Sequence, residues 1–489
     1  MSIKLALLVL LILFTGALLL LTGVQRVEAG RIIVPDHYPT IQEAVDNAID
    51  GYTIFVRKGT YNESIVVDRN VLLVGEDKTT TVIDGRCQGT ALKIIANNVT
   101  VTGFTIRQTT TTPPSTYLGL NLVSASNCNI TDNIIESCLD GIDAEAFSCC
   151  NIVSHNIVRN NAYDGIFLKN GSDNNLLFGN NFTGNKYYGM LIHSLSNNNL
   201  VTENNVTDNG WGIVIDSSSN NSISRNNIIH NTNSGFWLVY DACENRIEEN
   251  TVKNNHIGID KHYFEGQNNV IFHNSFANNT QQVYGSNPVN VWDDGYPSGG
   301  NYWSNYAGVD EKSGSSQDQP GSDGIGDIPL EADVNSQDNY PLMGVSNRFE
   351  ITYFTEPLIS HACNVTLISN STILGFVAPV WIEHQEDMFL EFNVTGEPGS
   401  TGFCRIHFPT AMMNGTYHVF VNGTEVAFAL LPCSNADYSY LYFTYSHSTE
   451  QVIIIPEFPS FLVTTLFMIA TLLAVSVSKE EHWLLPSYL

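Results

Sequence analysis

The chain has 489 residues, with 49 acidic side chains against 21 basic ones and a formal net charge of −28 at pH 7. This balance argues against nucleic acid as a partner, because phosphate binding needs a basic surface. Hydrophobic residues make up 43% of the sequence, so an acidic disordered chain is excluded and folded domains are expected. The abundant Asn, Ser, Thr and Gly favour turns and strands over helices.

Residues 1–29 are predicted to be a secretory signal or an N-terminal anchor. An apolar run from Leu5 to Leu21 follows Lys4, and a small-residue cleavage site ends at Ala29. The run is also long enough to remain as an uncleaved membrane anchor. Either reading exports the rest of the chain. About a dozen Asn-x-Ser/Thr triplets, Asn62 among them, are typical of an exported glycoprotein.

A second apolar run, within residues 461–478, predicts a C-terminal transmembrane helix. It follows a proline-containing break, is closed by Lys479, and has roughly the minimum length that crosses a bilayer. The preceding segment, Ile455 to Pro459, resembles the PEF-type sorting signal of archaeal surface proteins. We therefore expect a protein anchored at the cell surface.

The middle of the chain is an internal repeat of 22 to 24 residues. A glycine follows each of the first six marker asparagines after eight or nine residues, so two independent markers share one period. The asparagines are Asn133, Asn156, Asn180, Asn204, Asn226, Asn250 and Asn274, and the glycines are Gly141, Gly165, Gly189, Gly212, Gly235 and Gly258.

Each repeat carries three short apolar clusters, three residues before the asparagine, two after it and one after the glycine. Ile130, Ile135 and Ile142 mark these positions in one repeat. Three short strands and three bends fit one coil of a parallel β-helix, with rungs about 4.8 Å apart. We expect the marker asparagines to form a stack of amides, because asparagine suits left-handed bends and can bond to the coils above and below. A second column, five residues later, comprises Asn161, Asn185, Asn209, Asn231, Asn255 and Asn279.

The predicted β-helix spans residues 31–344 and is followed by a small β-sandwich over residues 347–455. A capping box at Thr40 to Glu43 predicts a short helix through Ile49 that plugs the first coil. In the second domain, alternating strands and Asn-Gly turns predict hairpins. Nine cysteines lack the paired spacing of a zinc site. A disulfide is plausible in the second domain, among Cys363, Cys404 and Cys433.

The segments Pro39 to Val45, Gly59 to Glu63 and Val71 to Gly75 resemble the entry of the pectin-lyase-like right-handed parallel β-helix superfamily. The Asn/Gly coils are most similar to the NosD-type subgroup, and Trp292 to Trp303 is similar to the segment that closes many archaeal members. This resemblance implies an all-β solenoid and either carbohydrate binding or copper handling. Copper would need a cluster of Met, His or Cys ligands, and these residues are scattered along the chain.

Asp140 and Asp164 are weak catalytic candidates, because each precedes its glycine on adjacent coils and the two could form a carboxylate pair. By the resemblance, β-helix hydrolases use clustered aspartates for acid and base roles. A solvated pair at a bend is the alternative. A Gly-His-Gly motif followed by Arg-Ile-Lys would suggest a lyase of this fold, and the sequence does not contain it.

Two binding sites are predicted from residue type. Exposed aromatic rings could stack on sugars, although some could pack instead, and these are Tyr187, Tyr188, Trp211, Trp237 and Tyr240. A loop rich in Asp and Gly could hold a structural calcium ion through several carboxylates, since hard cations prefer oxygen ligands. Its candidate ligands are Asp318, Asp323, Asp327, Asp333 and Asp338.

The sequence thus predicts an exported, membrane-anchored surface protein that binds extracellular polysaccharide or envelope glycans, or helps to build the envelope, without catalysis. A polysaccharide lyase or hydrolase is the first alternative, and a copper-handling accessory protein is the second.

Overall fold

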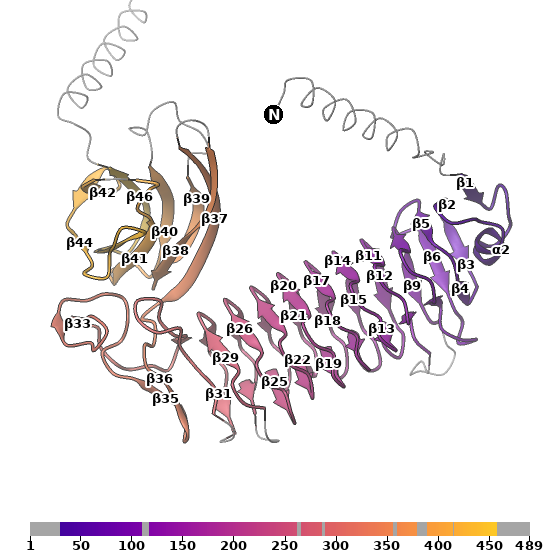
Figure 1. Cartoon of the computed structure of the whole chain (residues 1–489), viewed down its shortest axis with the longest axis horizontal. Coiled ribbons are helices and arrows are strands. Elements are labelled where there is room, and N and C mark those ends of the chain that lie inside the picture. Colours follow the sequence, from indigo (N-terminus) through magenta and orange to yellow (C-terminus); the bar gives the residue numbers. More distant parts are fainter. Residues whose placement is uncertain are drawn as a thin grey trace, which may run out of the picture.

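The computed structural model describes residues 30–109, 117–261, 266–285, 289–355, 359–378, 389–413 and 415–456 (Figure 1). It shows a long parallel β-helix that continues into a domain of two antiparallel sheets. The expected N-terminal signal and the C-terminal segment 461–478 lie outside the described residues. Within the described ranges, no helix has the length and apolar character needed to cross a membrane.

Three parallel sheets run the length of the solenoid, and each coil contributes one strand to each sheet. Sheet A contains β1 (Arg31–Val34), β2 (Tyr52–Val56), β5 (Val71–Gly75), β8 (Thr100–Thr102), β11 (Asn129–Thr131), β14 (Ile152–Ser154), β17 (Leu176–Phe178), β20 (Leu200–Thr202), β23 (Ser222–Ser224), β26 (Arg246–Glu248) and β29 (Val270–Phe272). Sheet B contains β3 (Gly59–Tyr61), β6 (Thr81–Asp84), β9 (Thr105–Arg107), β12 (Ile134–Glu136), β15 (Ile157–Arg159), β18 (Asn181–Thr183), β21 (Asn205–Thr207), β24 (Asn227–Ile229), β27 (Thr251–Lys253), β30 (Ser275–Ala277) and β32 (Tyr302–Trp303).

Sheet C, which carries the candidate site, contains β4 (Ile65–Val67), β7 (Leu92–Ile94), β10 (Leu120–Val123), β13 (Ile142–Glu145), β16 (Ile166–Leu168), β19 (Tyr188–His193), β22 (Trp211–Asp216), β25 (Ser234–Val239), β28 (Ile257–Asp260) and β31 (Gln281–Tyr284). The pairing register advances by one repeat at each step, so Ile142 faces Ile166 and Ile166 faces Met190. All three apolar columns read from the sequence are buried in one continuous core. The predicted parallel β-helix is confirmed.

Asparagine ladders hold the corners of the coils. In the ladder that begins at Asn133, each side-chain amide and each backbone N–H donates to Oδ1 of the asparagine one coil on, as Asn156 does to Asn180 at 3.0 Å. The residue before each ladder position has a left-handed backbone, such as His155 with φ 55°. The asparagine is required at this corner because its side-chain amide forms hydrogen bonds with three buried polar groups in each coil.

The structure contains a third ladder that the sequence analysis did not identify. It precedes sheet A, and its first six members lie five residues before the first ladder, just as the second ladder lies five residues after it. In the first of these coils, Cys128 occupies the third-ladder position and Cys138 the second-ladder position. Their backbone N–H groups donate to Asn151 and Asn161. The third ladder comprises Asn151, Asn175, Asn199, Asn221, Asn245, Asn269 and Asn290.

A helix and a tryptophan pair close the two ends of the core. Helix α2 (Ile41–Asp46) begins at Thr40, whose hydroxyl accepts the Glu43 N–H at 3.2 Å, and it buries Ile41, Ala44 and Val45 against the first coils. At the other end, Trp303 stacks on Phe276 at 4.6 Å between ring centroids. Two short hairpins follow, β33 (Lys312–Ser313) with β34 (Gln319–Pro320), and β35 (Leu330–Asp333) with β36 (Ser336–Asp338).

The remaining strands form two five-stranded antiparallel sheets that share one hydrophobic core. One sheet contains β37 (Val345–Thr355), β38 (Ile359–Ser369), β41 (Thr401–Pro409), β45 (Tyr438–Ser446) and β44 (Phe428–Leu430). The other contains β39 (Thr372–Val377), β40 (Leu390–Thr395), β46 (Thr449–Pro456), β42 (Tyr417–Val421) and β43 (Thr424–Val426).

The disulfide considered plausible in this domain is not formed, because Cys363, Cys404 and Cys433 are all thiols. Cys404 is buried in the core beside the Tyr445 hydroxyl. Cys363 lies on β38 and Cys433 follows β44.

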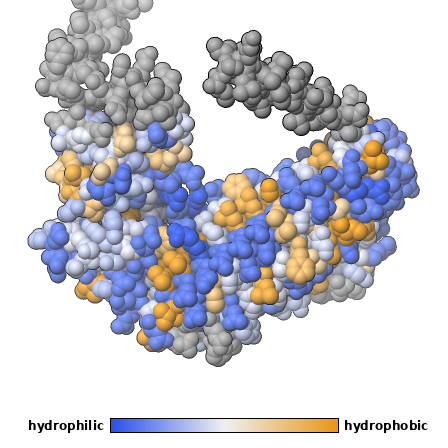
Figure 2. Space-filling model, in the orientation of Figure 1, coloured by the Kyte–Doolittle hydropathy of each residue, from blue (hydrophilic) through white to orange (hydrophobic). Residues whose placement is uncertain are grey.

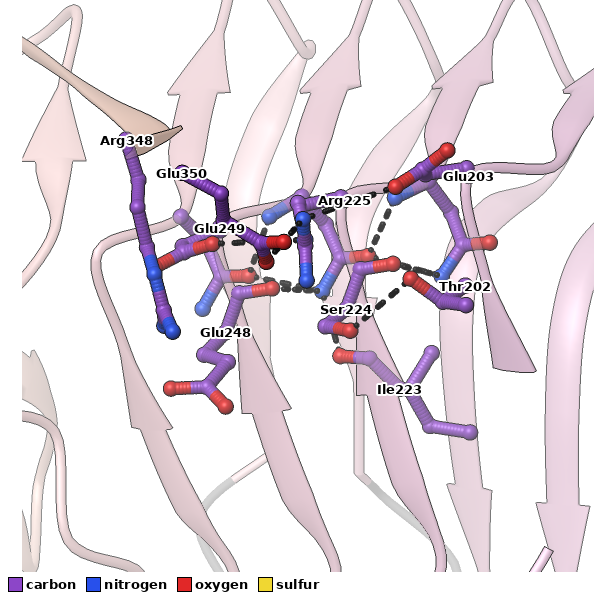
Figure 3. A network of polar contacts seen from close by, with 12 residues as sticks. Thr202, Glu203, Ile223, Ser224, Arg225, Glu248, Glu249, Arg348 and Glu350 are labelled. Carbon is purple, nitrogen blue, oxygen red and sulfur yellow. Dashed lines mark hydrogen bonds and ion pairs between the residues drawn. The ribbon is translucent and has the colours of Figure 1, made fainter. Parts of the chain in front are cut away.

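The two-sheet domain docks on the C-terminal coils through charge and apolar contacts. Arg225 lies between Glu203, Glu249 and Glu350, at 3.4, 3.7 and 3.1 Å, and Arg348 donates to Glu249 at 3.2 Å (Figure 3). The buried Arg405 donates to the Pro297 carbonyl at 2.6 Å. Its neighbour Phe403 belongs to an apolar cluster with Ile325, Leu342 and Ile368. This cluster joins the closing segment, residues 304–344 between β32 and β37, to this domain.

Candidate cleft on the outer face of sheet C

Three successive strands of sheet C carry apolar side chains on the face that looks away from the core. Strands β19, β22 and β25 are each six residues long, whereas most solenoid strands have three. Their outward residues Leu191, Val214 and Val239 are nevertheless buried, in a cluster separate from the core. Much of the visible solenoid surface is hydrophilic, with separate apolar patches (Figure 2). Apolar residues gathered at outward positions of consecutive coils make this face a candidate binding surface.

Aromatic side chains enclose this apolar floor and make a cleft of roughly 330 Å³. Trp237 stacks on Trp211 with ring centroids 5.7 Å apart, and Tyr188 lies edge-on to Trp211 at 5.5 Å. The rings are half-buried, so each presents one part to the floor and one to solvent. The cleft is lined by Phe167, Tyr188, Leu191, His193, Val214, Asp216, Trp237, Val239 and Tyr240.

One polar pair lies within the cleft. His193 and Asp216 occupy paired positions on β19 and β22, and their Nδ1 and Oδ2 atoms are 3.1 Å apart. Asp216 also accepts a hydrogen bond from the Ser217 hydroxyl at 2.8 Å. An apolar floor with a few convergent polar groups is the usual composition of a small-molecule or sugar site.

The structure brings Asp140 and Asp164 together at the N-terminal side of this cleft. The Asp164 N–H donates to Asp140 Oδ1 at 3.0 Å, and the N–H of the cleft residue Tyr188 donates to Asp164 Oδ1 at 3.1 Å. Burial raises the pKa of Asp140. Burial, and then the Asp140 carboxylate, raise the pKa of Asp164 to about 7. Near neutral pH, Asp164 can therefore exchange a proton.

Asp143 is a third carboxylate of this group that the sequence analysis missed. Its Oδ2 accepts a hydrogen bond from Lys169 at 2.8 Å, and burial raises its pKa to about 6 against the effect of that lysine. Asp143 Oδ1 and the Oδ1 of Asn121, its partner on β10, are both buried acceptors without a donor. Asp143 does not precede a marker glycine, so only its outward position on β13 could have indicated it.

The aromatic residues chosen from the sequence divide between the cleft and its surroundings. Tyr188 and Trp237 form its walls, and Tyr240 lies at its rim with 54% of its surface exposed. Trp211 supports Trp237 from behind. Tyr187 stacks instead on Tyr163 at 4.5 Å, outside the cleft. The cleft floor was missed, although its signal was visible as three consecutive apolar residues in each of three repeats.

The five aspartates proposed for calcium lie at separate points of the closing segment. Asp338 accepts N–H groups from Asn301, Trp303 and Tyr340, and Asp333 pairs with Lys261. Asp327 caps the N–H groups of Glu311 and Lys312, Asp323 accepts the Ile325 N–H, and Asp318 is exposed. Each buried carboxylate in this set therefore serves a different turn.

The description "Periplasmic copper-binding protein (NosD)" belongs to a family model that matches residues 45–235 and 215–308. These ranges together cover more than half of the chain. The chain belongs to the NosD family. The family's description names a periplasmic protein, in agreement with the export expected from the N-terminal segment. A search among curated proteins found no match.

Several solved structures resemble this NosD-family chain in fold. The A-module of a mannuronan C-5 epimerase from Azotobacter vinelandii is 14% identical, covers 51% of this chain and 91% of its own, and has a TM-score of 0.38. The Dettilon tailspike protein is 14% identical over 87% and 93%, with a TM-score of 0.42. An alginate lyase from Paenibacillus is 17% identical over 53% and 94%, with a TM-score of 0.33. These likenesses concern the fold alone.

The family description raises the question of whether this NosD-family chain has ligands for copper. Copper sites gather several soft or nitrogen ligands on one point. Across the described ranges, no three His, Cys, Asp or Glu side chains converge in this way. The residues present there do not fit the ion that the family description names.

Proposed function

We propose that this protein is an exported surface protein that binds a glycan chain in the aromatic cleft of sheet C. The observation that carries the proposal is the apolar floor of Leu191, Val214 and Val239 beneath the half-buried ring of Trp237. Sugar rings have apolar C–H faces and polar edges. The floor and rings match the faces, while His193 and Asp216 can bond to hydroxyl groups.

The direction of the cleft suits a polymer. Its lining residues come from β16, β19, β22 and β25, which stack along the solenoid axis. An extended chain lying along that axis would contact successive coils, and each further sugar would add contact area. We propose in addition that segment 461–478 anchors the protein, so that the solenoid displays this cleft outside the membrane.

Calorimetric titration of the purified protein with neutral and acidic oligosaccharides, with and without calcium, tests the proposal. We expect binding by at least one glycan, and a loss of at least about tenfold in affinity in Trp237→Ala, since buried aromatic contacts dominate such sites. Tyr163→Ala removes an exposed ring outside the cleft and should bind as the parent does. Equal binding by Trp237→Ala would contradict the proposal.

A second candidate function is glycoside cleavage, which the carboxylates beside the cleft favour. Asp164, with a pKa of about 7, can act as an acid, while a neighbouring carboxylate such as Asp140 or Asp143 can act as a base. Release of new reducing ends from a bound glycan, lost in Asp164→Asn, would establish this activity. Tight binding without product, at enzyme concentrations that saturate the glycan, would reject it.

A further inference from the structure

The charges around the cleft are strongly one-sided. Among its lining residues Asp216 is a carboxylate, and none of the described lining residues is a lysine or arginine. Further carboxylates lie on strands β13 and β28 of sheet C or two residues before β13 and β16. They are Asp140, Asp143, Glu145, Asp164 and Asp260.

The lysine beside the cleft already has anionic partners. Lys169, whose ammonium lies 4.7 Å above the ring centroid of Phe167, pairs with Asp143 at 2.8 Å and with Glu145 at 3.5 Å. Lys261 is buried and pairs with Asp333. His193 faces Asp216. The ammonium groups of Lys169 and Lys261 are therefore already engaged by carboxylates, and Lys93, at an outward position of β7, lies three strands from β16.

A glycan carboxylate in this cleft would meet repulsion that water screens poorly. Electrostatic interactions strengthen where low-dielectric walls exclude water, and a cleft lined by one sign of charge focuses that field. The floor and aromatic walls supply those low-dielectric surroundings. The formal charge of −28 adds a long-range term of the same sign. Hydroxyl groups carry no such cost and can bond to Asp216.

We infer that the cleft selects uncharged glycans and rejects uronates. This inference rests on the proposed glycan binding and adds the chemical class of the ligand. Unpaired like charges at a binding site cost binding energy and so discriminate against a wrong partner.

Matched oligosaccharide pairs that differ only in charge test the inference. The probes are cellohexaose with its C6-oxidised glucuronate form, mannohexaose with a mannuronate hexamer of the same linkage, and a methyl-esterified galacturonate hexamer with the free acid. Titrated at pH 7.5 in 50 mM salt, the neutral member of any pair that binds should be at least about tenfold tighter. Raising the salt to 500 mM should narrow that ratio, because screening weakens the repulsion.

Two variants separate charge from shape. Asp216→Asn removes the carboxylate that lines the cleft, and it should improve uronate binding relative to neutral binding severalfold. Asp208→Asn removes an exposed carboxylate at a corner outside the cleft and should leave the ratio unchanged. An acidic member that binds as tightly as its neutral partner overturns the inference and leaves glycan binding standing. No binding by any of the six probes overturns glycan binding and the inference together.

Discussion

Asn301 ends the first asparagine ladder by donating its backbone N–H to Asp338 Oδ2 at 2.8 Å. In the preceding coils, the corresponding N–H donates to Oδ1 of the next asparagine, as Asn274 does to Asn301. The same carboxylate oxygen accepts Trp303 Nε1–H at 2.8 Å, and the other accepts the Tyr340 N–H at 3.1 Å. A side chain from the closing segment thus terminates the repeat and holds the tryptophan that covers the core.

Asp338→Ala should destabilise the β-helix by about 3 kcal/mol or more, because it leaves three donors without an acceptor in a buried site. Asp338→Asn keeps one carbonyl oxygen and should cost less. Denaturant unfolding measures both. Asp318→Ala, at an exposed position of the same segment, is the control and should stay within about 0.5 kcal/mol of the parent. A cost for Asp338→Ala as small as that of the control would contradict the capping role.

Asn226→Ala should also cost about 3 kcal/mol or more. Asn226 donates to Val201, Ser224 and Asn250 and accepts two hydrogen bonds from Asn204, so its removal leaves buried groups unpaired on both neighbouring coils. The adjacent Asn227 is half-buried on the outer face and donates to Asn205 at 2.9 Å. Asn227→Ala should therefore cost less than about 1.5 kcal/mol. Similar losses for the two variants would show that the ladder is not what holds the corner.

The contribution of Asp164 to the stability of the protein should fall as pH rises from about 4 towards 7. The folded pKa of Asp164 is raised to about 7, so the folded state binds a proton there that the unfolded chain releases near pH 4. The stabilisation is complete below the unfolded pKa and is lost as pH rises through the folded value.

Asp164→Asn keeps the acceptor for Tyr188 and removes the ionisation, so it should flatten this part of the profile. Unfolding free energies measured at intervals between pH 4 and 8 give the profiles. Asp208→Asn serves as the exposed control and should keep the parental slope. A slope unchanged by Asp164→Asn would contradict the assignment.

Arg405→Ala should loosen the two-sheet domain from the solenoid. Its guanidinium is buried, donates to the Pro297 carbonyl and lies 5.5 Å from the centroid of the Tyr440 ring. We expect two calorimetric transitions in place of one, with a loss of about 3 kcal/mol in the less stable part. Arg348→Ala removes a more exposed pair with Glu249 and should cost less than about 1 kcal/mol. A single, unshifted transition in Arg405→Ala would rule out this role.

Much of the fold was predictable because it is periodic. The columns through Ile130, Ile135 and Ile142 follow from burial in every coil, and the asparagine column follows from the left-handed corner beside it. The third ladder was within reach, since Asn151 lies five residues before Asn156, as Asn161 lies five after it. The sequence prediction included only the asparagines that lie five residues after the first ladder, so the third ladder was missed.

The candidate site was less predictable, because it depends on departures from the repeat. Leu191 and Val214 have the residue types of core positions, and they differ from core residues only in standing between two inward residues of the same strand. Asp338 lies in a non-repeating segment, where spacing gives no guide to contacts. Its partner Asn301 is remote in sequence, so the carboxylate was expected to be a calcium ligand.

The central claim is that a glycan occupies the cleft of sheet C, and tryptophan fluorescence tests it most directly. Trp237 lines the cleft and Trp211 stacks on it, whereas Trp292 and Trp303 are buried at the far end of the core. Titration with a neutral oligosaccharide should shift the emission of the parent protein in a saturable manner, and the shift should disappear in the double variant Trp211→Phe, Trp237→Phe. A saturable shift of equal size in the double variant would place the ligand elsewhere and contradict the account.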